Sequence, residues 1–197
     1  MRKIVLLFWL VCFVAAGAAA QVSSPLKVYG GGGLSFPAKP DAFKDSYKKG
    51  FHGFVAVGLP VFPKLEALPK LEYHTFGGDL SNVGGGDVRV LMVGVDGKLN
   101  LTLPMFPIKP YLIAGIGMAG IRQTEFDTPN IPQASDLTLE NQTKFYYNLG
   151  AGTAWKLLMA VDLFAQVHYV AISTSADGKS FDDATRFWAL SVGIKIL

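Results

Sequence analysis

Three histidines, His52, His74 and His168, are the most obvious groups in this sequence for proton transfer near neutral pH. Two of them, His74 and His168, could combine with an acid such as Glu72 or Asp162 to ligate a metal ion. The spacing does not favour this, because the sequence contains neither an HExxH motif nor a CxxC pair. We therefore predict no metal site and no cofactor.

A serine and histidine pair is the second chemistry to consider, and His168 with Ser173 is the best local pairing. These residues are five positions apart in one predicted strand, so their side chains point to opposite faces. That is poor geometry for the proton transfer of a Ser–His–acid set. We predict no catalytic residues and a protein that is not an enzyme.

The elements that position these residues are predicted by a strict alternation of bulky apolar residues with small or polar ones. In the last segment Trp188, Leu190, Val192, Ile194 and Ile196 point one way, and the Ala, Ser, Gly and Lys between them point the other. A solvent-facing set would be rich in charge, whereas this set is mostly small. Small residues are expected inside a narrow barrel, with the bulky residues facing lipid.

Eight such segments are predicted as strands, and the connections between them alternate in length. The strands are Leu26–Phe36, Phe51–Phe62, Pro69–Gly77, Asp87–Leu103, Pro110–Arg122, Lys144–Trp155, Val161–Ser173 and Phe187–Leu197. Long connections, such as Gln123–Thr143, alternate with short ones, such as Lys156–Ala160. This asymmetry predicts an all-β, eight-stranded antiparallel up-and-down transmembrane barrel, with short periplasmic turns and long external loops.

The N-terminus and the composition support export and a membrane location. Residues 1–20 combine basic Arg2 and Lys3, an apolar stretch and small residues before Gln21, as in a cleaved signal peptide. We expect residues 21–197 to form a single domain without cysteine, because Cys12 is the only one. The mean hydropathy is +0.33, yet no mature segment has 18 uninterrupted apolar residues, and a membrane protein without apolar helices must be a closed barrel.

The charge balance excludes nucleic acid as a partner. Without Arg2 and Lys3, the 18 basic residues become 16 against 15 acidic ones, and no basic stripe is present that could neutralise phosphates.

Ten polar residues are predicted to point into the lumen. They are Lys27, Lys70, Glu72, His74, Asp96, Lys98, Asp162, Gln166, His168 and Lys195. Opposite charges enclosed together can pair, so we interpret this network as structural packing, with pore lining as the alternative. Trp155 and Trp188 are predicted to belong to the two interfacial aromatic girdles.

Three blocks of sequence resemble the small outer-membrane β-barrel proteins of the OmpA/OmpX type. They are KPYLIAGIGMAGI from Lys109 to Ile121, FYYNLGAGTAWKLLMAVDLFAQVHYV from Phe145 to Val170, and LSVGIKIL from Leu190 to Leu197. The resemblance implies Sec export to the bacterial outer membrane, with outer-membrane lipid and the barrel-assembly machinery as partners. One departure is Leu197, which stands where that family usually ends in an aromatic residue.

Three functions follow as hypotheses. The first is a non-enzymatic outer-membrane barrel that supports the envelope or binds a surface ligand through its external loops, above all loop 123–143. The alternatives are a narrow channel for ions or small apolar solutes, suggested by the polar lumen, and a lipid-modifying outer-membrane enzyme that would use His168.

Overall fold

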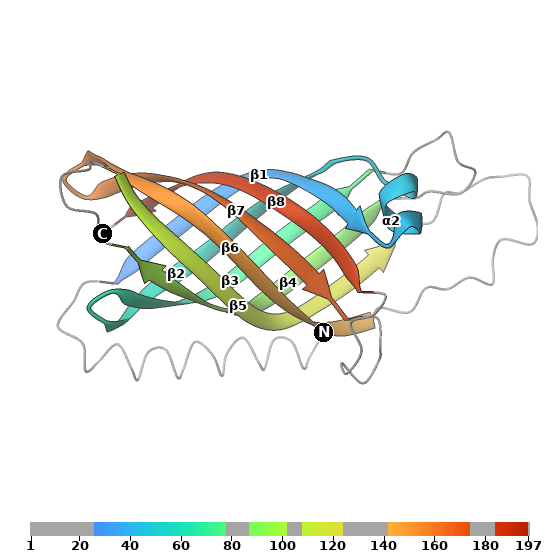
Figure 1. Ribbon diagram of the computed structural model, residues 1–197, viewed down its shortest axis with the longest axis horizontal. Coiled ribbons are helices and arrows are strands. Elements are labelled where there is room, and N and C mark those ends of the chain that lie inside the picture. Colours follow the sequence, from blue (N-terminus) through green and yellow to red (C-terminus); the bar gives the residue numbers. More distant parts are fainter. Residues whose placement is uncertain (1–25, 78–86, 102–107, 124–141, 174–183, 197) are drawn as a thin grey trace, which may run out of the picture.

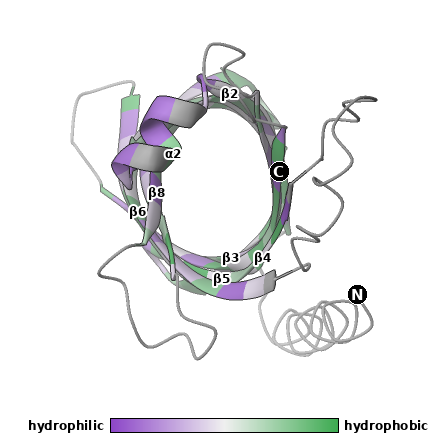
Figure 2. Cartoon of the chain, turned by 90° about the vertical axis from the view of Figure 1, so that its right-hand side faces the viewer, coloured by the Kyte–Doolittle hydropathy of each residue, from purple (hydrophilic) through white to green (hydrophobic). Residues whose placement is uncertain are grey.

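Period-two alternation continues through eight strands, and the sheet that they form closes on itself. The computed structural model describes residues 26–77, 87–101, 108–123, 142–173 and 184–196. The strands are β1 Lys27–Lys39, β2 Gly50–Phe62, β3 Leu65–Phe76, β4 Val88–Asn100, β5 Ile108–Gln123, β6 Gln142–Leu158, β7 Val161–Ile172 and β8 Thr185–Ile196. Each strand pairs antiparallel with its neighbours in sequence, and β8 pairs with β1 (Figures 1 and 2). The predicted eight-stranded up-and-down barrel is confirmed.

The two faces of the sheet differ as the alternation requires. Along β4, for example, Val90 and Asp96 are buried inside the barrel, whereas Leu91 and Leu99 point outward and are exposed. The outer wall is dominated by large apolar side chains, which suits a lipid environment rather than water. The closed ladder also pairs the backbone groups that an open sheet edge would leave unsatisfied.

Two prolines that are the first residues of predicted strands lie inside the observed strands. Pro69 is within β3 and Pro110 within β5. The ladder between β2 and β3 passes from Lys70 to Ala67, so the missing amide of Pro69 falls where the pairing is interrupted. On the β4 side of β5 the register ends at Tyr111, just before Pro110, so that proline removes no ladder bond there.

The connections give the barrel two different ends. Residues 63–64, 101–107 and 159–160 connect strands at one end, here named the turn end. Residues 40–49, 77–87, 124–141 and 173–184 connect them at the other, here named the loop end, where the helix α2 Asp41–Ser46 also lies (Figures 1 and 2). By the asymmetry typical of such barrels, the turn end is the end predicted to face the periplasm.

Some sequence predictions fall outside the described residues. They are the signal peptide of residues 1–20, most of loop 123–143, and Leu197. In the part of the chain that the structure describes, no helix has the length and apolar character needed to cross a bilayer.

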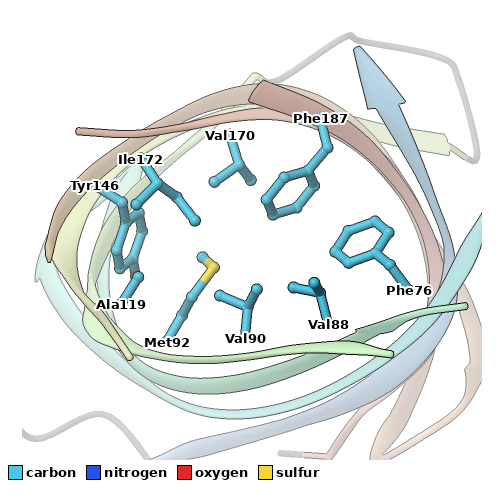
Figure 3. Packing of buried hydrophobic residues seen from close by; sticks show 9 residues of the cluster. All are labelled: Phe76, Val88, Val90, Met92, Ala119, Tyr146, Val170, Ile172 and Phe187. Carbon is cyan, nitrogen blue, oxygen red and sulfur yellow. The ribbon is translucent and has the colours of Figure 1, made fainter. Parts of the chain in front are cut away.

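Large apolar side chains fill the lumen near the loop end. The cluster consists of Phe76, Val88, Val90, Met92, Ala119, Tyr146, Val170, Ile172 and Phe187, and these side chains converge across the lumen (Figure 3). At the loop end, Phe43 of α2 and Tyr47, which directly follows α2, pack against this cluster. We name it the apolar plug. The expectation that small residues and a few charges would fill the lumen is therefore wrong for this end.

Inward-facing glycines explain how eight strands enclose such large rings. A Cβ atom at Gly94 or Gly117 would collide with Tyr146, and one at Gly152 would collide with Tyr111. The predicted small residues therefore leave the space inside the barrel that the aromatic rings of facing strands occupy.

Candidate functional site

The ten residues predicted to line the lumen all lie on the inner face of the barrel. Eight are buried, and Lys27 and Lys195 are partly exposed near the turn end. They divide into a layer near the turn end and a layer in the middle of the barrel, with the apolar plug beyond. No functional assignment for these residues follows from their position alone, so their role stays a prediction.

The layer near the turn end is built around Glu66. The carboxylate of Glu66 lies 2.6 Å from the Lys27 ammonium, and it accepts a hydrogen bond of 2.6 Å from the Tyr29 hydroxyl. Lys98 donates to the same Tyr29 hydroxyl at 3.2 Å, and its ammonium lies 4.7 and 4.2 Å from the ring centres of Tyr29 and Tyr111. The two ring faces thus help to compensate a lysine withdrawn from water.

Two further contacts complete this layer. Lys195 pairs with Asp162 at 2.6 Å across the β7–β8 ladder. The Tyr111 hydroxyl donates to Gln166 at 3.1 Å. A cavity of about 10 Å³ lies between these groups and the middle layer, about the smallest space that holds one water molecule.

The middle layer is centred on Lys70, whose ammonium contacts two carboxylates. It lies 2.9 Å from Glu72 and 2.8 Å from Asp96. Asp96 also accepts a hydrogen bond of 2.8 Å from the side-chain amide of Asn148. A charge this deeply buried is tolerable only when it is compensated, and the Lys70 ammonium is paired with both carboxylates.

The three histidines gather beside Glu72. The Nε2 atoms of His74 and His168 lie 3.1 and 3.3 Å from the same Glu72 oxygen. The rings of His52 and His74 are stacked with centres 5.0 Å apart. One carboxylate therefore accepts contacts from two imidazoles and from the lysine.

Two serines connect the histidines across the lumen. Ser35 Oγ lies 3.0 Å from His52 Nδ1 and 2.8 Å from His74 Nδ1. On its other side, His52 Nε2 lies 2.8 Å from Ser191 Oγ. This network joins β1, β2, β3 and β8 through side chains that are nearly or fully buried.

The formal charges inside the lumen balance. The two layers contain four lysines, Lys27, Lys70, Lys98 and Lys195, and four carboxylates, Glu66, Glu72, Asp96 and Asp162. These two layers therefore need no bound ion for neutrality.

The chain Ser35–His74–Glu72 has the connectivity of a nucleophile, a base and an orienting acid. All three side chains are completely buried. This burial and the hydrogen bond between Ser35 and His74 fit a structural support better than a site open to a substrate. The earlier pairing partner, Ser173, is buried at the end of β7 and donates its backbone amide to the Phe145 carbonyl.

Within the described ranges, no group of three or more histidine, cysteine, aspartate or glutamate side chains is arranged to hold a metal ion. The imidazoles of His74 and His168 face the carboxylate of Glu72, and Lys70 already occupies the other side of that carboxylate.

Sequence reasoning missed several members of the network. They are Tyr29, Ser35, His52, Glu66, Tyr111, Asn148 and Ser191. The alternation could have predicted that they point inward. Each is an even number of positions from a predicted lumen residue or from an inward-facing small residue on the same strand. For His52 this signal was hidden by Phe54, a large apolar residue that also points inward.

Trp155 and Trp188 both lie on the outer wall, 38% and 48% exposed. Trp155 is near the turn end of β6, and Trp188 is near the loop end of β8, where its ring packs 4.9 Å from that of Tyr169. Opposite ends of the wall are where two girdles would place them.

A closed antiparallel barrel of eight strands, apolar outside and filled with paired polar groups inside, defines the class of small outer-membrane β-barrels. The match to the family model of the outer membrane protein beta-barrel domain covers residues 6–195, and the chain belongs to this family. Members of this family lie in the bacterial outer membrane.

Solved structures share the fold at low sequence identity. Neisserial surface protein A is 17% identical with a TM-score of 0.61, and the match covers 88% of this chain and 97% of that one. OprG from Pseudomonas aeruginosa is 13% identical with a TM-score of 0.54, covering 87% and 94%. The outer membrane enzyme PagL is 14% identical with a TM-score of 0.49, covering 88% and 99%. No match was found among curated protein sequences. At these identities the likeness concerns the fold alone.

Proposed function

We propose that this protein is a non-enzymatic outer-membrane barrel that acts through its exterior, supporting the envelope and binding surface ligands through its external loops. The observation that carries the proposal is the filled lumen. Paired charges occupy the layer near the turn end and the middle layer, and the apolar plug closes the loop end. With the interior committed to packing, the wall and the loops are the surfaces left for function.

The same proposal includes the route to the membrane. Residues 1–20 direct Sec export and are then removed, and the barrel-assembly machinery inserts the remaining chain among outer-membrane lipids. The support is the basic and apolar composition of that segment and the family of the barrel.

Conductance in planar bilayers separates this proposal from a narrow channel. We expect no current above leak from the folded wild type, because the plug residues are almost completely buried against one another. Lys98→Ala should be equally silent, since the ring of contacts around Lys70 stays in place. A unitary current in the wild type that Lys98→Ala changes would favour the channel.

Replacing loop 123–143 by a short Gly/Ser linker tests the surface role. The two flanking strands share a continuous ladder from Ile108 to Ala119, whose partners Trp155 to Lys144 all lie outside the replaced residues. We expect the variant to retain the faster migration of an unboiled barrel on gels and to lose any surface binding that the wild type shows. Loss of folding would contradict the division between scaffold and loop.

A lipid hydrolase assay tests the enzyme alternative. Purified wild type and His168→Ala should both leave phospholipid and lipopolysaccharide unchanged, because His168 faces Glu72 deep in the lumen. Activity in the wild type that disappears in His168→Ala would overturn the non-enzymatic proposal.

A further inference from the structure

The barrel exposes positive and negative charge at different ends. Of the 15 acidic residues, four are buried in the lumen and all the others lie in the loop-end connections. The turn-end connections contain no acidic residue, and they contain Lys64. Among the residues that the structure describes at the turn end, every exposed charged side chain is therefore basic.

Two of these exposed lysines, Lys109 and Lys156, belong to the inner face of the barrel. Lys156 of β6 is the direct partner of Asp162 in the ladder with β7, and Asp162 is buried inside. Lys109 of β5 is the direct partner of Ala154, which is also buried inside. Directly paired residues share a face of the sheet, so both lysines lie at the turn-end mouth of the lumen. We name them the mouth lysines.

The carboxylates beside the mouth are already contacted by other lysines. Glu66 lies 2.6 Å from Lys27, and Asp162 lies 2.6 Å from Lys195. Both carboxylates are withdrawn from water, with side-chain exposures of 7% and 3%. The mouth lysines therefore add two exposed positive charges outside the packed layer, and this surface attracts an anionic partner.

An exposed apolar tip lies beside the mouth lysines. The β6–β7 hairpin turns at Met159 and Ala160 at the turn end (Figure 1), and Leu158 and Met159 are 64% and 92% exposed. Met159 is four residues beyond Trp155, whose position suits the aromatic girdle of this end, so the tip lies on the aqueous side of that girdle. Exposed apolar side chains rimmed by polar ones are typical of protein interaction sites, where methionine is enriched.

The spacing of the mouth lysines matches that of carboxylates on an extended chain. They are diagonal neighbours in the β5–β6 register, because Lys109 pairs with the residue two positions before Lys156. Their Cβ atoms are therefore about 7 Å apart. Side chains at alternate positions of an extended peptide are also about 7 Å apart on one face. Acidic residues at alternate positions would thus give each ammonium a carboxylate.

From these observations we propose that the turn-end mouth binds an acidic segment of a periplasmic protein, with its carboxylates on Lys109 and Lys156 and an apolar side chain on Met159. The mouth lysines face the lumen axis, whereas lipid surrounds the outer wall, so the partner comes from the aqueous side. The inference goes beyond the loop-mediated binding proposed above. It shares with that proposal the orientation in which the turn end faces the periplasm.

The test uses the full mature barrel in phosphatidylcholine nanodiscs, which leave both ends accessible. The probe is a short peptide of alternating glutamate and leucine, and NMR titration gives its Kd. For K109Q/K156Q we expect the Kd to rise about fivefold, the effect of losing two exposed ion pairs. For M159S we expect a rise of about threefold, because one partly buried apolar contact is lost. A peptide with glutamine in place of glutamate should bind both K109Q/K156Q and the wild type equally weakly.

Matched variants separate a site from general charge. K39Q/K44Q removes two exposed lysines at the loop end and should bind the peptide as the wild type does. K109R/K156R keeps the charge at the mouth and should keep the affinity. Heat-modifiability on gels shows that each variant is folded. The variant without loop 123–143 should also bind the peptide normally, so failure of the loop proposal and failure of this site are distinguishable.

A wild type that does not bind the acidic peptide would overturn the proposal, as would equal affinity of K109Q/K156Q and wild type. An equal loss in K39Q/K44Q would show that net charge acts without a site. Nanodiscs containing phosphatidylglycerol provide the last arm. If that lipid displaces the peptide through the mouth lysines, the site belongs to lipid headgroups and the proposed protein partner is wrong.

Discussion

At the scale of single residues, Lys70 shows why the interior is a packed network. Its ammonium is shared by Glu72 and Asp96, and it is almost completely removed from solvent. Asp96 is held in turn by Asn148. Withdrawing such groups from water costs several kcal/mol each, and only their mutual contacts offset that cost. Removing one member therefore costs more stability through the buried partner that is left unpaired than through the single lost contact.

Asp96→Asn should lower the free energy of unfolding by about 3 kcal/mol, because it leaves Lys70 with one carboxylate in place of two. The matched control is Asp87→Asn, at the exposed residue just before the same strand, where we expect a change below about 0.5 kcal/mol. Urea unfolding in phospholipid vesicles, followed by tryptophan fluorescence, measures both. Equal effects of the two substitutions would show that the lumen charges are hydrated and not mutually dependent.

At the scale of elements, strands fit together through glycines that face aromatic rings. Gly94 on β4 and Gly117 on β5 are partners in the ladder, and Tyr146 on β6 lies over both. The strands could not keep their spacing if either position carried a larger side chain, since Tyr146 is completely buried.

Gly94→Ala should therefore destabilise the barrel by about 1–3 kcal/mol through overpacking. Gly97→Ala, three residues along the same strand, points outward, and its added methyl would be 3.7 Å from the Ala114 carbonyl, an ordinary contact. That control should be neutral or stabilising by up to about 1 kcal/mol, because alanine restricts the unfolded chain. Thermal or urea unfolding of both variants in the same vesicles is the measurement. A tolerant Gly94→Ala would mean that Tyr146 moves freely.

The alternation predicted the strand number, the closure and the ten inward polar residues, because side-chain direction in a strand depends on parity alone. It could not predict which inward residues meet. Ser35 reaches His74 because β1 and β3 both flank β2, and that contact depends on the register between strands. The apolar plug was missed for a different reason: an inward Phe76 or Phe187 looks like a lipid-facing residue until the strand's parity is fixed by its neighbours.

At the scale of the whole molecule, these features fit together because the apolar wall faces hydrocarbon. Ile116 is near the middle of β5 and 58% exposed, and Leu158 is at the turn end of β6 and 64% exposed. In water the two exposed positions would be equivalent, and an arginine at either would cost little stability. In a bilayer the cost of a charge on the wall depends on its depth.

Ile116→Arg should therefore reduce the free energy of folding into vesicles by about 2–4 kcal/mol, whereas Leu158→Arg should cost no more than about 1 kcal/mol. Guanidinium titrations in vesicles, with the fluorescence of Trp155 and Trp188 as the signal, give both values. The pair is matched in charge introduced, in side chain removed and in exposure, so the difference between them reports depth alone. Two equal and small costs would place the wall in water, and the lipid-facing orientation on which the packed lumen and the two aromatic girdles depend would then be wrong.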